Sequence, residues 1–256
     1  MVTVHSTMVD ITMPDGTADA YLARPSDDNP HPGILYFMDA PGLRPSLKGY
    51  VDRLASAGYT VLAPNLFYRH GRSPVVEMPD VIDPIKYPKQ FESLWPIMGS
   101  LTAALSMADA DAYLRWLSGY AQAADGKVGT VGYCYGARVA LRTAGTYPDR
   151  VAAVAGFHGG DLATEASDSP HLLAKRVTAE AYFGHADKDP MLPQEQIDRL
   201  EKAFSDAGVR HKAEVYPGAS HGFTFPDTAY YHAAASERHW TPLLDLFART
   251  LQGNTP

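Results

Sequence analysis

A cysteine in a glycine-rich corner is the residue of this chain best suited to chemistry. Cys134 stands at the centre of the motif Gly-Tyr-Cys-Tyr-Gly at 132–136, between an apolar run at 128–131 and a helical segment at 137–145. A nucleophile on a sharp strand-to-helix turn needs small residues two positions away on both sides, and its strained backbone pushes the side chain outward. The helix that follows directs its free amide groups toward whatever is bound at the sulfur. Taken alone, the motif is equally compatible with a buried structural cysteine.

A histidine and an acid further along the chain complete a possible triad. His221 lies in a glycine-rich loop after an expected strand at 212–216, and Asp187 follows an expected strand at 179–183. His221 could accept the thiol proton, while Asp187 fixes the imidazole tautomer and stabilises the imidazolium. Asp189 competes for the second role, and either aspartate could instead cap the next helix. We predict Asp187 because it stands closer to the end of its strand.

These residues need a sheet that brings them together, and the order of apolar segments predicts one. The first 23 residues read as a hairpin, and later segments alternate between apolar strands and helices. The expected later strands are 33–38, 59–63, 128–131, 151–157, 179–183 and 212–216. This pattern predicts one α/β domain over 1–256, with a mostly parallel sheet, an antiparallel N-terminal edge and helices on both faces. Ligands of such sheets bind outside the carboxyl ends of the strands, where all three candidate residues fall.

One long segment does not follow the alternation. Residues 65–96 contain many prolines and aromatic residues with little periodicity, and a long helix is expected at 97–117. An irregular segment of this length within a compact domain is usually functional or mobile. We therefore expect 65–96 to form a lid or a wall of the substrate pocket.

Composition narrows the class of protein. The chain has 22 basic and 29 acidic residues and a net charge of −7, without a basic cluster, which argues against nucleic acid and membrane surfaces as partners. A single cysteine excludes an internal disulfide, and neither a signal peptide nor a membrane-spanning run is visible. We expect a soluble, cytoplasmic protein. The histidines, including His158 and His171, lack metal-binding spacing, so no metal is expected.

The quoted segments resemble the dienelactone hydrolase family of α/β-hydrolases over nearly the whole chain. The resemblance rests on the cysteine motif at 132–136 and on the segments 59–66, 182–187 and 216–223. The order nucleophile, acid, histidine is also that of α/β-hydrolases. The resemblance implies a triad of Cys134, His221 and Asp187, and hydrolysis of small esters or lactones through an acyl-thioester without a cofactor. It further implies an oxyanion hole formed by the backbone amides of Ala40 and Tyr135.

Two departures from the family pattern concern substrate binding. Asp39 replaces the glutamate that contacts the resting thiol in the family's lactonases, so we expect it to modulate Cys134. Where the lactonases hold the substrate carboxylate with arginines, this chain has an apolar segment at 223–225, which favours neutral or weakly polar substrates. The side chains expected near the substrate are Arg44, Tyr68, Trp95, Arg138 and Phe223.

Two other readings of the chain remain open. One is a carboxylesterase that acts on neutral or larger esters. The other is a non-catalytic ligand-binding protein that keeps the hydrolase fold, although a pocket for binding alone needs no aligned base. The expected partner in either case is a small molecule, and the sequence does not predict the oligomeric state.

Overall fold

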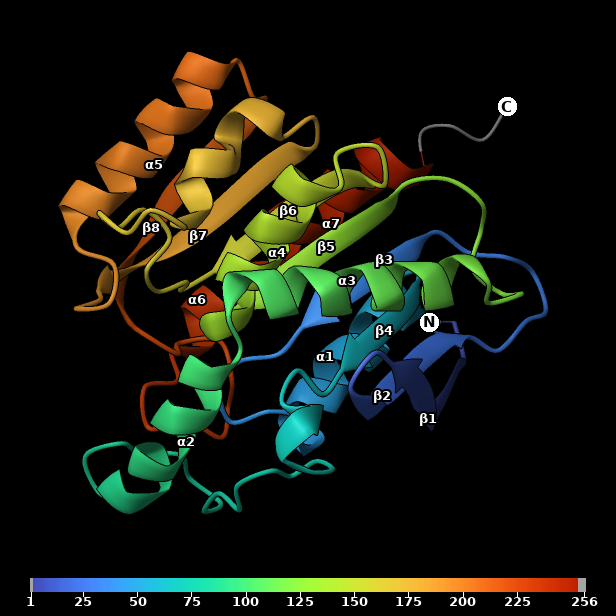
Figure 1. The fold of residues 1–256 in the computed structure, drawn as a ribbon, viewed down its shortest axis with the longest axis horizontal. Helices are drawn as coiled ribbons and strands as arrows, with labels where there is room; N and C mark the ends of the chain where they lie inside the picture. Colours follow the sequence, from blue (N-terminus) through green and yellow to red (C-terminus); the bar gives the residue numbers. More distant parts are fainter. Residues whose placement is uncertain (1, 253–256) are drawn as a thin grey trace.

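The computed structural model describes residues 2–252, and an eight-stranded sheet runs through them (Figure 1). The strand order is β1-β2-β4-β3-β5-β6-β7-β8, in which β1 and β2 pair antiparallel with their neighbours and the rest are parallel. The strands are β1 (Val4–Met13), β2 (Gly16–Pro25), β3 (Gly33–Phe37), β4 (Thr60–Pro64), β5 (Val128–Tyr133), β6 (Val151–Phe157), β7 (Glu180–Lys188) and β8 (His211–Ser220). The predicted parallel sheet with an antiparallel N-terminal edge is thus confirmed.

Burial explains the sequence pattern of the strands. Every residue of β3, β4 and β5 is buried, as expected of central parallel strands that are covered on both faces. The edge strand β1 exposes most of its residues, because only one of its faces meets the core. The apolar runs therefore mark the middle of the sheet, where the corner at Cys134 lies.

Helices cover both faces of the sheet, with α3 and α5 in front of it and α7 behind it in Figure 1. The helix α1 shares the rear face, because the ring of Tyr50 lies 4.9 Å from that of Trp240 in α7. The helices are α1 (Pro45–Ser56), α2 (Pro88–Ser100), α3 (Ala103–Ser118), α4 (Tyr135–Thr146), α5 (Gln194–Ala207), α6 (Ala233–Arg238) and α7 (Trp240–Phe247). Short helical turns lie at η1 (Tyr68–His70), η2 (Pro170–Arg176) and η3 (Ala248–Gln252).

The irregular segment at 65–96 ends in a helix that the sequence pattern does not predict. The predicted helix at 97–117 is two helices, because α2 already begins at Pro88 and the chain turns after Ser100. Thr102 caps α3 by accepting a hydrogen bond from the amide of Leu105. Between η1 and α2 the chain has no helix, and Ile82 forms an isolated bridge with Thr228. This bridge attaches the segment to the loop that follows β8.

The helices of residues 2–252 are all too short or too polar to cross a membrane.

Candidate active site

The corner at Cys134 has the backbone geometry that its motif predicts. Cys134 lies between β5 and α4 with a φ of 51° and a ψ of −116°, a conformation that is unfavourable for a residue with a side chain. A Cβ on Gly132 would overlap the carbonyl group of Gly136, and one on Gly136 would overlap the carbonyl oxygen of Phe37. Both glycines are therefore required, and the turn leaves Cys134 partly exposed.

His221 lies between the sulfur of Cys134 and an aspartate. Its Nε2 is 3.0 Å from the Cys134 Sγ, and its Nδ1 is 2.7 Å from Oδ2 of Asp189. Asp189 is buried, and its Oδ1 accepts a hydrogen bond from the amide of Met191. The three side chains form a continuous hydrogen-bonded row, which is the arrangement of a nucleophile, a base and an orienting acid.

The prediction that Asp187 is the partner of His221 is wrong. Asp187 is exposed, and its Oδ2 accepts a hydrogen bond from the amide of Gly218 in β8. The strand β7 continues to Lys188 and its register with β8 shifts between Ala186 and Lys188. The acid just beyond the strand is therefore Asp189, two residues later than the apolar run suggests.

The charges around His221 favour its protonated form. Burial opposes the imidazolium, but the negative charge at Cys134 and the hydrogen bond to Asp189 outweigh it and raise the pKa of His221 to about 10. The same two neighbours hold the ring in the orientation that points Nε2 at the sulfur. A cationic His221 beside Cys134 is the partner that a thiolate nucleophile requires.

A second histidine adjoins the first, and the sequence analysis did not assign it a role. The ring of His158 lies 5.4 Å from that of His221, and its Nε2 is 2.8 Å from Oγ1 of Thr224. His158 is fully buried and has a φ of 38°. Burial lowers the pKa of His158 well below its usual value, so the ring is neutral. Its place directly after the apolar run of β6 is the signal that could have marked it, since ligands bind at strand ends.

A cavity of about 480 Å³ opens at the cysteine, and most of its walls are apolar. Ala40 and Pro41 follow β3, Phe91, Trp95 and Met98 come from α2, and Pro190 and Met191 follow β7. The irregular segment supplies Ile82 and Pro84 as well. Of the five residues expected near the substrate, Trp95 lines this cavity.

Arg44 lies behind the cavity and holds two carboxylates. Its guanidinium donates to both carboxylate oxygens of Asp39 at 2.6 and 2.9 Å, and its Nε donates to Asp227 at 2.7 Å. Asp39 is buried, which raises the pKa of its carboxyl group, while the charge of Arg44 opposes this effect. Within residues 2–252 Asp39 makes no hydrogen bond to Cys134, so the contact expected to modulate the thiol is not formed, and both Asp39 oxygens accept from Arg44 instead.

The other three residues expected near the substrate pack elsewhere. Tyr68 donates a hydrogen bond to the buried Asp109, and Arg138 lies over the ring of Tyr135. Phe223 is fully buried and stacks on Tyr216, so the segment after the histidine faces the core instead of the substrate. Their side chains contribute to packing around the site.

The two residues expected to supply the oxyanion hole are Ala40 and Tyr135. Ala40 lines the cavity, and Tyr135 is the first residue of α4, where an amide has no acceptor within its own helix. The Tyr135 hydroxyl donates to the carbonyl groups of Met98 and Leu101, which ties this corner to the end of α2. The two amides remain the predicted oxyanion hole.

No cluster of three or more histidine, cysteine or acidic side chains suited to a metal ion occurs in residues 2–252.

The sheet order and the placement of the site at its carboxyl edge define an α/β-hydrolase fold. A model of the dienelactone hydrolase family matches residues 18–251. The chain belongs to this family, and it is accordingly a hydrolase of the carboxymethylenebutenolidase-like type that acts on ester or lactone bonds.

Individual relatives support this assignment. A protein of Methylorubrum extorquens, assigned provisionally as a carboxymethylenebutenolidase, is 28% identical over 242 residues, which are 93% of this chain and 79% of the relative. A protein of Escherichia coli K12 with the same provisional assignment is 27% identical over 234 residues, which are 89% of this chain and 81% of that one. The crystal structure of a protein of Klebsiella pneumoniae, assigned provisionally as a dienelactone hydrolase, has the same fold, with a TM-score of 0.82 and 24% identity over 96% of this chain and 99% of the other.

Proposed function

We propose that this chain hydrolyses esters or lactones through a Cys134–His221–Asp189 triad without a cofactor. The observation that carries the proposal is the hydrogen-bonded row from the Cys134 sulfur through both nitrogens of His221 to Asp189. A ligand-binding protein would need the cavity but not a nucleophile aligned with a base and an orienting acid.

The proposed reaction has two halves. The Cys134 thiolate attacks the carbonyl carbon, and the amides of Ala40 and Tyr135 stabilise the negative charge that develops on the oxygen. His221 then gives its proton to the departing alkoxide, so that an alcohol leaves and an acyl-thioester remains. In the second half, neutral His221 takes a proton from water, the resulting hydroxide attacks the thioester, and the acid is released with the thiolate restored. Asp189 keeps the imidazole in one tautomer throughout.

The cavity indicates which acyl groups this site accepts. Its walls are largely apolar, and the charge of Asp39 is compensated by Arg44. Apart from His221, which is paired with Asp189, the cation among the described lining residues is the exposed Lys188, which makes no ion pair within residues 2–252. We infer that neutral, apolar acyl groups bind preferentially. A matched pair of substrates, an ester with a free carboxylate on its acyl group and the corresponding methyl ester, tests this through kcat/KM. A preference for the free acid would contradict the inference, and its disappearance in Lys188→Met would trace that preference to Lys188.

We infer further that the chain forms a single domain and that residues 65–96 act as a lid over its substrate cavity. Ile82, Pro84, Phe91 and Trp95 all come from this segment and form one side of the cavity. Trp95 exposes 52% of its surface, which leaves it free to cover a bound substrate.

The decisive experiment looks for the acyl-enzyme. Wild-type protein mixed with p-nitrophenyl acetate should release a burst of nitrophenolate, and the intact mass should rise by one acetyl group located on Cys134. Cys134→Ala should show neither signal and lose roughly 10³-fold or more in turnover. Because Cys134 is the single cysteine, a thiol reagent also titrates this site alone. Full turnover by Cys134→Ala would refute the mechanism.

A further inference from the structure

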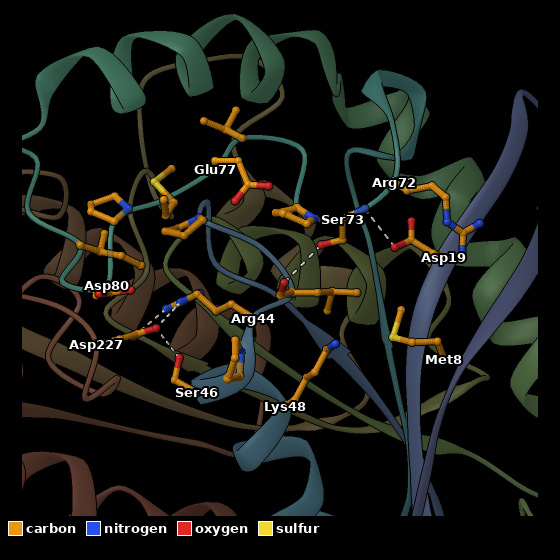
Figure 2. A pocket seen from close by; sticks show the side chains of 18 residues that line it. Met8, Asp19, Arg44, Ser46, Lys48, Arg72, Ser73, Glu77, Asp80 and Asp227 are labelled. Atoms are coloured by element: carbon orange, nitrogen blue, oxygen red, sulfur yellow. Dashed lines mark hydrogen bonds and ion pairs between the residues drawn. The ribbon is translucent and has the colours of Figure 1, made fainter.

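A second cavity, of about 720 Å³, lies beside the first and plays no part in the proposed reaction (Figure 2). Its walls are the loop after β3 and the start of α1, Met8 and Asp19 from within β1 and β2, and the segment from Arg72 to Ile82. Both cavities fall within the size range of small-molecule sites.

The two cavities adjoin. Pro41 and Ile82 line both of them, and the loop after β3 passes from one to the other. Asp39 and Ala40 belong to the catalytic cavity, whereas Leu43 and Arg44 belong to the second one. Consider an ester whose carbonyl group is held at the Ala40 amide. Its alcohol portion has a short path past Pro41 into the second cavity.

Hydrogen bonds connect residues in the wall of the second cavity. Arg44 connects Asp39 to Asp227, and the hydroxyl of Ser46 donates to the same Asp227 at 2.6 Å. On the opposite side, Asp19 accepts a hydrogen bond from the amide of Ser73 at 3.0 Å (Figure 2). Four segments that are distant in the sequence, at residues 19, 39–46, 73 and 227, are thus joined in two pairs around one opening.

The second cavity differs from the catalytic one in its chemistry. Lys48 from α1 and Glu77 from the irregular segment lie on opposite sides of it in Figure 2. Within residues 2–252 neither makes an ion pair, and the Lys48 ammonium lies 5.3 Å from the centre of the Tyr21 ring. Ser73 also lines the cavity. Prolines and methionines form much of the remaining surface. A hydrogen-bond donor and an acceptor that face each other without pairing suit a ligand whose groups can both donate and accept hydrogen bonds.

We propose that the second cavity binds the alcohol portion of an extended ester, and that this alcohol is a polyol such as a sugar. A hydroxyl group donates to a carboxylate and accepts from an ammonium, so that a polyol can join Lys48 and Glu77 where neither reaches the other. Its C–H faces pack against the proline and methionine side chains. The proposal rests on the proposed function, because the apolar acyl group of the same substrate occupies the cavity at Cys134.

Three esters of 3-phenylpropanoic acid test this proposal. The alcohols are methanol, cyclohexylmethanol and the primary hydroxyl of glucose, so that the second and third compare rings of similar size without and with hydroxyl groups. The glucose ester should exceed the cyclohexylmethyl ester in kcat/KM by roughly tenfold or more, since hydrogen bonds to charged groups contribute at least that factor. The gain should lie mainly in KM, because the alcohol contacts are made before the chemical step.

Lys48→Met and Glu77→Gln should each reduce this glucose-to-cyclohexylmethyl ratio severalfold. Lys202→Met removes an exposed lysine that pairs with Asp206 on α5, and it should leave the ratio unchanged. Hydrolysis of all three esters without a preference for glucose would overturn the proposal and leave the proposed function intact. An equal loss on all three esters in the Lys48 and Glu77 variants would also overturn it, because it would indicate a general structural effect. Hydrolysis of none of the esters would refute the proposed function and this proposal with it.

Discussion

Exchange of single carboxylates for amides distinguishes the two aspartates at the end of β7. Asp189→Asn keeps an oxygen for the Met191 amide but places a neutral group beside Nδ1 of His221. The amide can stabilise the wrong imidazole tautomer, and it no longer compensates the imidazolium. Asp187→Asn is the matched control, because it makes the same chemical change two residues away on an exposed side chain.

The expected sizes of the two effects differ widely. A triad whose aspartate becomes asparagine loses about 10⁴-fold in kcat, which corresponds to about 5.5 kcal/mol of transition-state stabilisation. Asp187 accepts one hydrogen bond, from the Gly218 amide, and its loss should lower the stability of the loop by about 1 kcal/mol. Activity of Asp187→Asn should stay within about threefold of wild type, since such a loop contact does not enter the transition state.

Two measurements check this prediction on each protein. The first is kcat/KM for p-nitrophenyl acetate, and the second is the pKa of His221 from the NMR chemical shifts of its ring. Asp189→Asn should lower that pKa below the wild-type value of about 10, because the carboxylate is one of the groups that raise it. If Asp187→Asn were the inactive variant and Asp189→Asn the active one, the assignment of the acid and the argument from the length of β7 would both fail.

Three further predictions concern the scaffold. Gly136→Ala should abolish activity and destabilise the fold, because its Cβ overlaps a backbone carbonyl, whereas Gly49→Ala, in an open part of α1, should stabilise the protein by up to about 1 kcal/mol in chemical denaturation. Arg44→Met leaves the Asp39 carboxylate buried without its cation and should cost about 3–5 kcal/mol of unfolding free energy; a loss below about 1 kcal/mol would contradict the buried ion pair. His185 is buried with both ring nitrogens unpartnered within residues 2–252, and burial lowers its pKa to about 4 from 6.5. Between these values the unfolded chain binds a proton that the folded chain does not, so stability falls as the pH falls from 6.5 to 4. His185→Leu should flatten this acid limb by about 1.4 kcal/mol per pH unit, and an unchanged slope would refute the argument.

The sequence by itself determined the features that depend on local sterics and local patterning. The corner at Cys134 follows from two glycines at fixed spacing, because no other residue fits against the Gly136 and Phe37 carbonyl groups. The buried runs of β3 and β5 follow from uninterrupted apolar residues. The loop position of His221 was equally clear, since glycine-rich residues after a strand mark the edge where the site lies.

Only the tertiary structure decided which groups meet across long distances in the chain. Asp189 replaces Asp187 because pairing with β8 extends β7 beyond its apolar run, and that pairing depends on residues about 30 positions away. Arg44, expected at the substrate, is held by Asp227, which lies 183 positions further along the chain. Where a side chain has two possible partners, the geometry of the surrounding segments decides which one it contacts. Such segments also enclose the second cavity, for which no local pattern in the sequence exists.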